Sequence, residues 1–160
     1  MTTDYTPIGA WVGREGRADV AISYRACRPE DIERVLELWR NGAPGGSTNN
    51  AAALETRLVR DRELFLLAWE GDALVGCLIG AWDGWRSNMY RLAVHPDYRR
   101  RGIASELVRR VEEMLRKLGA SRIYGLAPLD SPEAGPFWTA LGYAPDSDID
   151  PLVKNLRPVD

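Results

Sequence analysis

Histidine and cysteine are scarce in this sequence of 160 residues, which contains one histidine, His95, and two cysteines, Cys27 and Cys77. A structural zinc site takes four ligands, mostly of these residue types, at short spacings, so we expect no metal. The N-terminal residues show neither the basic start nor the apolar stretch of a secretion signal, and the cytoplasm is therefore the expected compartment. In that reducing compartment the two thiols are expected to be free and buried.

A charge excess and a long apolar run are absent as well. The 21 Lys and Arg residues nearly balance the 23 Asp and Glu residues, for a net charge of −2, which disfavours a general nucleic-acid binder or a membrane-surface protein. No apolar run approaches the roughly 20 residues that span a bilayer. A nucleic-acid module that uses arginines 99–101 is further disfavoured by Glu106, Glu112 and Glu113 on the helix that follows. We therefore expect neither a nucleic-acid nor a membrane partner.

The pattern of apolar residues divides the chain into one N-terminal extension and one domain. Residues 1–20 show no sustained periodicity and are expected to form an extension, whereas residues 21–160 have the length of a single domain. Strands and helices are expected in the following order: strand 22–27, helix from 28, helix 51–61, strands 64–69, 73–82 and 88–94, helix 102–118, strand 121–126, helix 132–141 and a strand within 150–156. The sequence predicts an α+β fold of three layers (α/β/α), with helices on both faces of a mixed sheet.

The most informative segment runs from Leu92 to Ser105 and reads as strand, short loop and helix. The N-terminus of a helix has free backbone N–H groups and a partial positive charge, so it can bind an anion. Gly102 stands at this point and, without a Cβ, allows a phosphate to approach the backbone. Ala104 is nearly as small, and Ser105 offers a hydroxyl donor. The segment therefore predicts a phosphate site.

The pattern Arg99-x-x-Gly102-x-Ala104 resembles the acyl-CoA pyrophosphate loop of the GNAT superfamily of N-acetyltransferases. The apolar strand before it and the amphipathic helix after it have the order found in that family. A later segment, from Phe137 to Tyr143, is similar to the Phe-Tyr-x-x-x-Gly-Phe of the family. The resemblance covers about residues 22–156, and it implies six to seven strands that are mostly antiparallel, with a V-shaped splay between strands 4 and 5.

The resemblance implies acetyl-CoA as cosubstrate and assigns its contacts. The pyrophosphate would lie on the loop, and the pantetheine arm would lie along the edge of the preceding strand. The backbone amide near Val94 would polarise the thioester carbonyl. The cofactor-binding residues that follow from this are Leu92, Ala93, Val94, Arg99, Arg100, Arg101, Gly102, Ile103, Ala104 and Ser105.

The two residues that commonly perform proton transfer in this family are replaced here. Trp138 stands where many members have a tyrosine acid, and an indole N–H is not a general acid at neutral pH. Asn88 stands at the position of the glutamate base of histone-type members, and it cannot take a proton. The catalytic residues are therefore unassigned. The resemblance implies an acetyltransferase acting by direct attack of an amine, and the two replacements raise the alternative of a non-catalytic acyl-CoA-binding or sensing domain.

The resemblance implies that the acceptor is an amine of a small molecule or a protein. Trp82, Asp83 and Trp85 lie in one strand turn and are candidate acceptor-site residues. The glycine-rich segment 42–46 is expected to be a mobile loop, since no Lys-Ser/Thr follows it as in a P-loop, and the resemblance implies that it lies beside the acceptor site. A homodimer is common for the fold and is allowed here.

Overall fold

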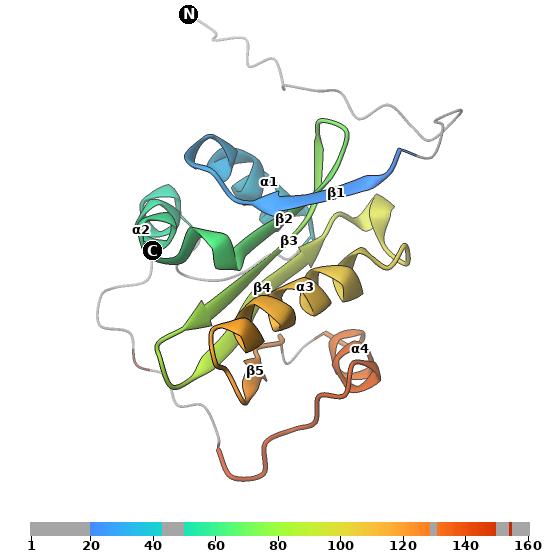
Figure 1. Ribbon diagram of the computed structural model, residues 1–160. Helices are drawn as coiled ribbons and strands as arrows, with labels where there is room; N and C mark the ends of the chain where they lie inside the picture. Colours follow the sequence, from blue (N-terminus) through green and yellow to red (C-terminus); the bar gives the residue numbers. More distant parts are fainter. Residues whose placement is uncertain (1–19, 43–49, 129–130, 150–153, 155–160) are drawn as a thin grey trace, which may run out of the picture.

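The computed structural model describes residues 20–42, 50–128, 131–149 and 154. In this part of the chain a five-stranded sheet lies at the centre, with helices on both of its faces (Figure 1). The predicted fold class, α+β with a mixed sheet in three layers, is confirmed. Three predictions fall wholly or mainly outside the described residues: the extension 1–20, the glycine-rich loop 42–46 and the final strand within 150–156.

The strands follow one another across the sheet in the order of the sequence. They are β1 (Ile22–Ala26), β2 (Phe65–Glu70), β3 (Ala73–Trp82), β4 (Ser87–Val94) and β5 (Ile123–Gly125). The pairs β1–β2, β2–β3 and β3–β4 are antiparallel, and the pair β4–β5 is parallel. Gly71, with φ +57°, and Gly84, with φ +95°, lie in the turns that join β2 to β3 and β3 to β4, because these left-handed angles suit glycine.

The helices divide between the two faces. On one face lie α1 (Ile32–Gly42), which a 3-10 turn at Pro29–Asp31 precedes, and α2 (Ala51–Asp61), which a 3-10 turn at Arg62–Leu64 follows. On the other face lie α3 (Ile103–Lys117) and α4 (Ala134–Ala140). The helix expected from residue 28 thus begins with a 3-10 turn, in which Pro29 takes the first position and Asp31 accepts the backbone N–H of Arg28 at 2.8 Å.

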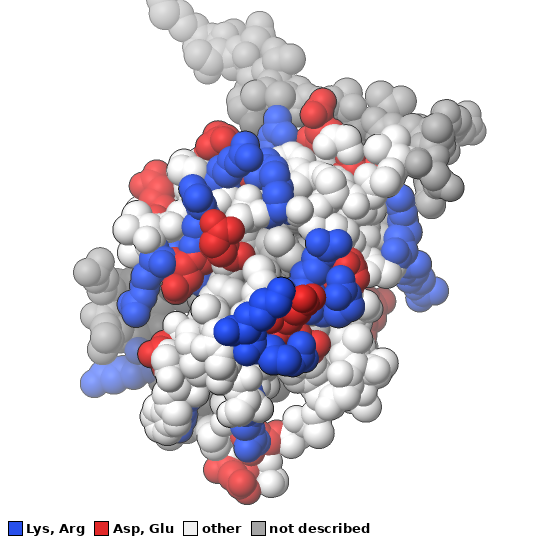
Figure 2. All heavy atoms as spheres, in the orientation of Figure 1, with Lys and Arg blue, Asp and Glu red and all other residues white. Residues whose placement is uncertain are grey.

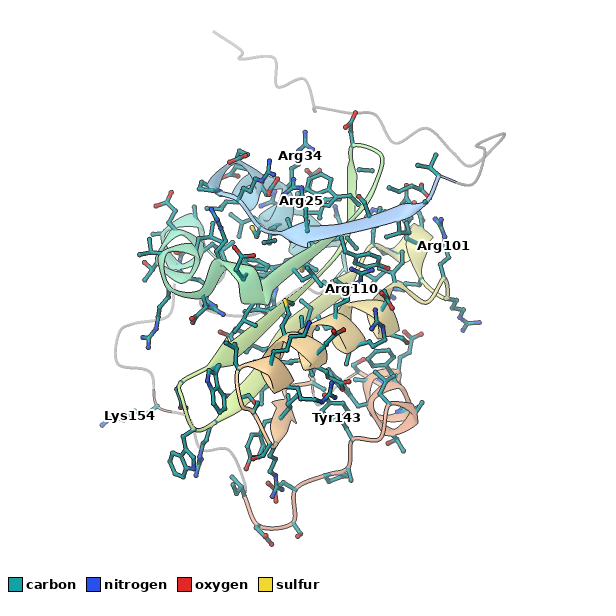
Figure 3. All side chains as sticks on the ribbon, in the orientation of Figure 1. Arg25, Arg34, Arg101, Arg110, Tyr143 and Lys154 are labelled. Atoms are coloured by element: carbon teal, nitrogen blue, oxygen red, sulfur yellow. The ribbon has the colours of Figure 1, made fainter. Side chains whose placement is uncertain are left out.

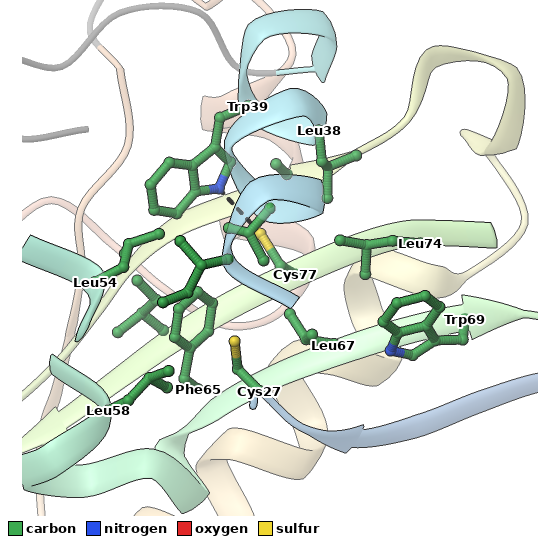
Figure 4. Packing of buried hydrophobic residues seen from close by; sticks show 14 residues of the cluster. Cys27, Leu38, Trp39, Leu54, Leu58, Phe65, Leu67, Trp69, Leu74 and Cys77 are labelled. Carbon is green, nitrogen blue, oxygen red and sulfur yellow. Dashed lines mark hydrogen bonds between the residues drawn. The ribbon is translucent and has the colours of Figure 1, made fainter. Parts of the chain in front are cut away.

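Each face of the sheet has its own hydrophobic core, and β3 contributes to both. Leu74, Cys77 and Ile79 pack under α1 and α2 (Figure 4), while Val75 and Leu78 pack under α3. This alternation makes β3 a continuous apolar run, as expected of a strand that is covered on both sides. The α3 helix lies close to the sheet, because α3 side chains already approach the points where a Cβ on Gly76 or Gly80 would stand.

The strands β4 and β5 are paired only over a short stretch. The register is Ser87↔Ile123, Asn88↔Tyr124 and Met89↔Gly125, and the N–H of Leu126 donates to the carbonyl of Met89 at 2.8 Å. Past this point β4 continues to Val94, whereas the described β5 has ended. The two strands therefore separate after Met89, which is the splay that the resemblance implies.

No described helix is long and apolar enough to cross a membrane.

Candidate active site

The loop between β4 and α3 is held in shape by its own residues. After β4, Pro96–Tyr98 form a 3-10 turn in which the Nδ1 atom of His95 accepts the N–H of Asp97 at 3.3 Å. The buried imidazole also meets the Tyr98 ring edge-on, with the ring centres 5.7 Å apart. His95 thus has a structural role in the turn. Two residues then take left-handed angles, Arg100 with φ +60° and Gly102 with φ +75°, and α3 begins.

The start of α3 has the geometry of an anion site. The N–H groups of Ile103, Ala104 and Ser105 lie in the first helical turn, where no intrahelical acceptor exists. A Cβ built on Gly102 would meet no atom within 4 Å, so the space beside this backbone is open. A hollow of about 310 Å³ lies there, and the residues that line it are Gly102, Ser105, Glu106, Val108, Arg109, Glu112 and Leu141.

Two of the three loop arginines bind neighbouring parts of the protein. The guanidinium of Arg99 donates to the carbonyls of Val94, at 3.4 Å, and Gly42, at 3.1 Å, and so joins the end of β4 to the end of α1. The guanidinium of Arg101 donates to Glu70 Oε1 at 2.7 Å. The third, Arg100, is exposed. These contacts fix the loop against α1 and β2, a role that the sequence pattern alone does not distinguish from phosphate screening.

Charges of both signs are interleaved over the outer face of α3 (Figure 2). The carboxylate of Glu106 accepts hydrogen bonds from Arg109 at 2.8 and 2.9 Å and from Arg110 at 2.7 Å. The hydrogen bonds from Arg109, followed by those from Arg110, outweigh desolvation and lower the pKa of Glu106 to about 2. The carboxylate is therefore charged at neutral pH and engaged by two arginines at the rim of the hollow.

The predicted residues of the β4 edge lie between the loop and the splay. Ala93 faces the α1 side, and Leu92 and Val94 face the α3 side. On the inner edge Ala93 and Val94 are opposite Cys77 and Gly76 of β3. The other edge lies on the side of β5, beyond the last pair that the described strands form. The structure thus brings the β4 edge and the α3 N-terminus together along one continuous path.

Arg91 marks a bulge in β4 that the sequence does not reveal. The register with β3 shifts between Cys77 and Ile79, and Arg91 has a left-handed φ of +59°. Its guanidinium lies 4.2 Å from the centre of the Trp39 ring, and the Trp39 indole donates to the Cys77 sulfur at 3.1 Å. Burial lowers the pKa of Arg91. An arginine inside an apolar strand is the only sequence signal that points to this group.

The two cysteines belong to the core and carry no reactive thiol. Both are fully buried, and desolvation is the main reason that their pKa values rise to about 12. They are unpaired, as expected from the sequence. Among the described residues no group of three or more His, Cys, Asp and Glu lies close enough together to hold a metal ion.

The side chain of Trp138 packs against β5, next to the point where β4 and β5 separate. It belongs to α4 and is 9% exposed. A Cβ on Gly125 would stand 3.2 Å from two atoms of its indole, so the ring packs directly over this glycine. The Tyr143 ring meets the indole edge-on with centres 4.8 Å apart. The Tyr143 hydroxyl points toward α3 (Figure 3) and donates to Glu112 Oε1 at 2.7 Å.

Asn88, at the position of the family's base, and the candidate acceptor-site residues are at the other end of β4 from the loop. Asn88 is half-buried in the paired stretch of β4 and β5. Trp82 packs toward the α3 side, and Asp83 accepts the N–H groups of Trp85 and Arg86 within the hairpin turn. Trp85 is 76% exposed. The structure therefore gives Asp83 a role in the turn and does not bring these residues to the loop between β4 and α3.

The sequence profile of the acetyltransferase (GNAT) family matches residues 30–143. The chain belongs to this family. The match extends from the turn before α1 to Tyr143 and thus includes β4, the loop and α3. An acetyltransferase of Photorhabdus laumondii is 36% identical to this GNAT chain over 111 residues, which are 69% of the chain and 78% of the relative. An acetyltransferase of Sodalis glossinidius is 38% identical over 103 residues, which are 64% of the chain and 72% of the relative.

Solved structures of the same fold are more distant in sequence. The Ard1 protein of Thermoplasma volcanium superposes with a TM-score of 0.71 at 21% identity, over 78% of this chain and 84% of that one. The PaiA N-acetyltransferase of Thermoplasma acidophilum, solved in complex with coenzyme A, superposes with a TM-score of 0.72 at 19% identity, over 81% of this chain and 93% of that one. At these identities the two structures show the GNAT fold alone.

Proposed function

We propose that this chain is an acetyl-CoA-dependent N-acetyltransferase, which transfers an acetyl group to a primary amine of a small molecule or a protein. The observation that carries the proposal is the open space beside Gly102 at the start of α3, where the left-handed backbone favours glycine and no atom lies within 4 Å of the point where a Cβ would stand. Family membership and a fold shared with a coenzyme A complex support it.

The residues of the loop and of β4 divide the binding of acetyl-CoA between them. The N–H groups of Ile103, Ala104 and Ser105 would bind the pyrophosphate, because an anion is favoured at a helix N-terminus. The edge of β4 at Leu92, Ala93 and Val94 would bind the pantetheine amides as a further strand would. The bound cosubstrate would supply a thioester, whose thiolate is a stable leaving group.

Proton transfer is assigned to no described side chain. The indole of Trp138 is not an acid at neutral pH, and Asn88 is not a base. Burial, and then the hydrogen bond to the Glu112 carboxylate, raise the pKa of Tyr143 well above its usual value, so this phenol is a poor acid as well. An acceptor amine that arrives uncharged would need no base before the attack, and the proton that it loses on acetylation would pass to water or to the departing thiolate.

A thermal-shift experiment with acetyl-CoA tests the binding step. A ligand at a hundred times its Kd stabilises the folded protein by about 2.7 kcal/mol, so the melting temperature is expected to rise. An unchanged melting temperature at millimolar acetyl-CoA contradicts the proposal.

Release of the coenzyme A thiol with a panel of amines tests the transfer step. Turnover with at least one amine class, above the rate without amine, supports the enzyme. Binding of acetyl-CoA without turnover on any small amine, peptide or protein N-terminus supports the second candidate function, a sensing domain. The observation that favours that candidate is the pair Trp138 and Asn88 at the usual positions of the acid and the base.

A further inference from the structure

The opening between β4 and β5 is closed at the end where the two strands pair, and this closed end would limit the space for the acyl group. The inference rests on the proposed function, since it takes the pantetheine arm to lie along the edge of β4. From the loop the edge runs toward Met89, which is fully buried. There the Met89 carbonyl accepts the N–H of Leu126, and β5 closes the opening. If the pantetheine arm lies along this edge, an acyl chain on its thioester would point toward Gly125 and the side chain that covers it.

Trp138 covers Gly125 at contact distance. Three neighbouring atoms of the six-membered ring, Cε3, Cζ3 and Cη2, would be 3.2, 3.2 and 3.3 Å from a Cβ on this glycine. A separation of that size leaves no room for a methyl group without movement of the ring. Glycine at position 125 therefore allows the indole of Trp138 to pack closely against the end of β5.

The indole cannot easily withdraw from this position. The Tyr143 ring stands edge-on to it at 4.8 Å, and the Phe137 ring does so at 5.4 Å. Tyr143 is in turn held to α3 by its hydrogen bond to Glu112, and its N–H donates to the Trp138 carbonyl at 3.0 Å. A series of contacts therefore runs from α3 through Tyr143 and Trp138 to β5 and fixes the ring.

We propose that Trp138, seated on Gly125, forms the end wall of the acyl site and restricts the donor to acetyl-CoA and other short acyl-CoA thioesters. Trp138 is then a specificity-determining residue and takes no part in proton transfer. An apolar pocket discriminates one methylene by about 10- to 200-fold, and a wall with buried support is expected to lie in that range. Removing the ring opens the space that a longer chain needs.

Calorimetric titration of the full chain with acetyl-, propionyl-, butyryl- and hexanoyl-CoA tests the proposal without knowledge of the acceptor. The wild-type protein is expected to bind hexanoyl-CoA at least tenfold more weakly than acetyl-CoA. In Trp138→Ala this ratio is expected to fall at least tenfold, mainly through tighter binding of hexanoyl-CoA. Trp85→Ala, which removes an exposed tryptophan of the β3–β4 turn, is the matched control and is expected to leave the ratio unchanged.

Gly125→Ala is a second test, in which a longer acyl-CoA is expected to bind more weakly relative to acetyl-CoA rather than more tightly. Gly125 does not have a left-handed φ, so alanine fits its backbone, and its methyl group, which would stand 3.2 Å from the Trp138 ring, is expected to displace the ring by a few tenths of an ångström and narrow the closed end. The affinity for propionyl-CoA relative to acetyl-CoA is expected to drop at least threefold. Trp138→Leu replaces Trp138→Ala if the alanine variant does not fold, as judged by circular dichroism.

The outcomes separate this inference from the proposed function. If acetyl-CoA binds but the hexanoyl-to-acetyl ratio is the same in wild type and in folded Trp138 variants, Trp138 does not form the wall and the inference is overturned. If the wild-type protein binds hexanoyl-CoA as tightly as acetyl-CoA, no wall exists. If neither coenzyme A nor any thioester binds, the proposed function itself fails.

Discussion

Two glycines, one at each end of α3, make a matched pair of single-residue tests. Gly102 has φ +75° and Gly119 has φ +101°, and a Cβ on either would meet no atom within 4 Å. Replacement by alanine is expected to cost each protein about 1–2 kcal/mol of stability from the left-handed backbone. Only Gly102→Ala is expected to weaken acetyl-CoA binding, because its new methyl group projects into the space beside the helix N–H groups.

Glutamate at the same position is expected to have a stronger effect. Gly102→Glu places a negative charge where the pyrophosphate would lie, so the affinity should fall well over tenfold, which corresponds to more than about 1.4 kcal/mol. Isothermal titration of both Gly102 variants and of Gly119→Ala measures the difference. Equal affinities in all three folded variants and the wild type would show that the loop is not the pyrophosphate site.

The sequence predicts the role of a single residue where that role follows from the local backbone. Gly102 is recognisable because a glycine before an amphipathic helix implies an accessible N-terminus. The roles of Arg99 and Arg101 could not be predicted, because their partners, Gly42 and Glu70, are brought beside the loop only by the assembled sheet. Trp138 was identified as a departure from the family pattern, but its seat on Gly125 depends on how α4 returns to β5.

The junction of β1 with α1 depends on one buried carboxylate, and its stability is expected to depend on pH. Asp31 accepts both ends of the Arg25 guanidinium, at 2.6 and 2.8 Å, and the N–H of Arg28. Burial by itself would raise the pKa of Asp31, but the hydrogen bonds from Arg25 and Arg28 outweigh it and hold the pKa below its usual value of 3.8. This contribution to stability is therefore present above pH 3.8 and is lost as the pH falls below it.

Asp31→Asn is expected to lower the free energy of unfolding by about 1–3 kcal/mol at pH 7, since Arg25 remains partly solvated. The deficit should shrink as the pH falls from 4 toward 2 and the wild-type carboxyl becomes protonated. Urea unfolding at several pH values measures it. Glu30→Gln, in the same turn but with an exposed side chain, is the control and should change the free energy of unfolding very little at any of these pH values. A deficit that is constant with pH would contradict the assigned charge.

At the scale of elements, most of the fold follows from the apolar periodicity. The bounds of α2 and β3 agree with the sequence to the residue, because caps and turns mark their ends. The bulge at Arg91 could not be predicted, since no local signal distinguishes a bulged arginine from a regular one. The short pairing of β5 follows from the splay, which depends on tertiary packing rather than on β-propensity.

The fold buries both thiols, so the rate at which a reagent modifies them reports how often the protein unfolds globally. Cys27 and Cys77 are fully buried with pKa values of about 12, so N-ethylmaleimide at pH 7.5 should modify neither in the native protein within minutes, and both in denaturant. If labelling requires global unfolding, acetyl-CoA at a hundred times its Kd should slow it about a hundredfold. Mass spectrometry counts the modified thiols, and rapid labelling of one thiol in the folded protein would show that it is exposed.

The order of the strands in the sheet has a consequence for the synthesis of the protein. Each described strand from β2 onward pairs with the strand that precedes it in the chain, so the growing polypeptide can extend the sheet from one edge while its C-terminal part is still on the ribosome. The three pairings from β1 to β4 need no residue that is translated after Val94. Among the five described strands, β5 alone must await α3, so the opening between β4 and β5 is the last part of the described sheet to take shape.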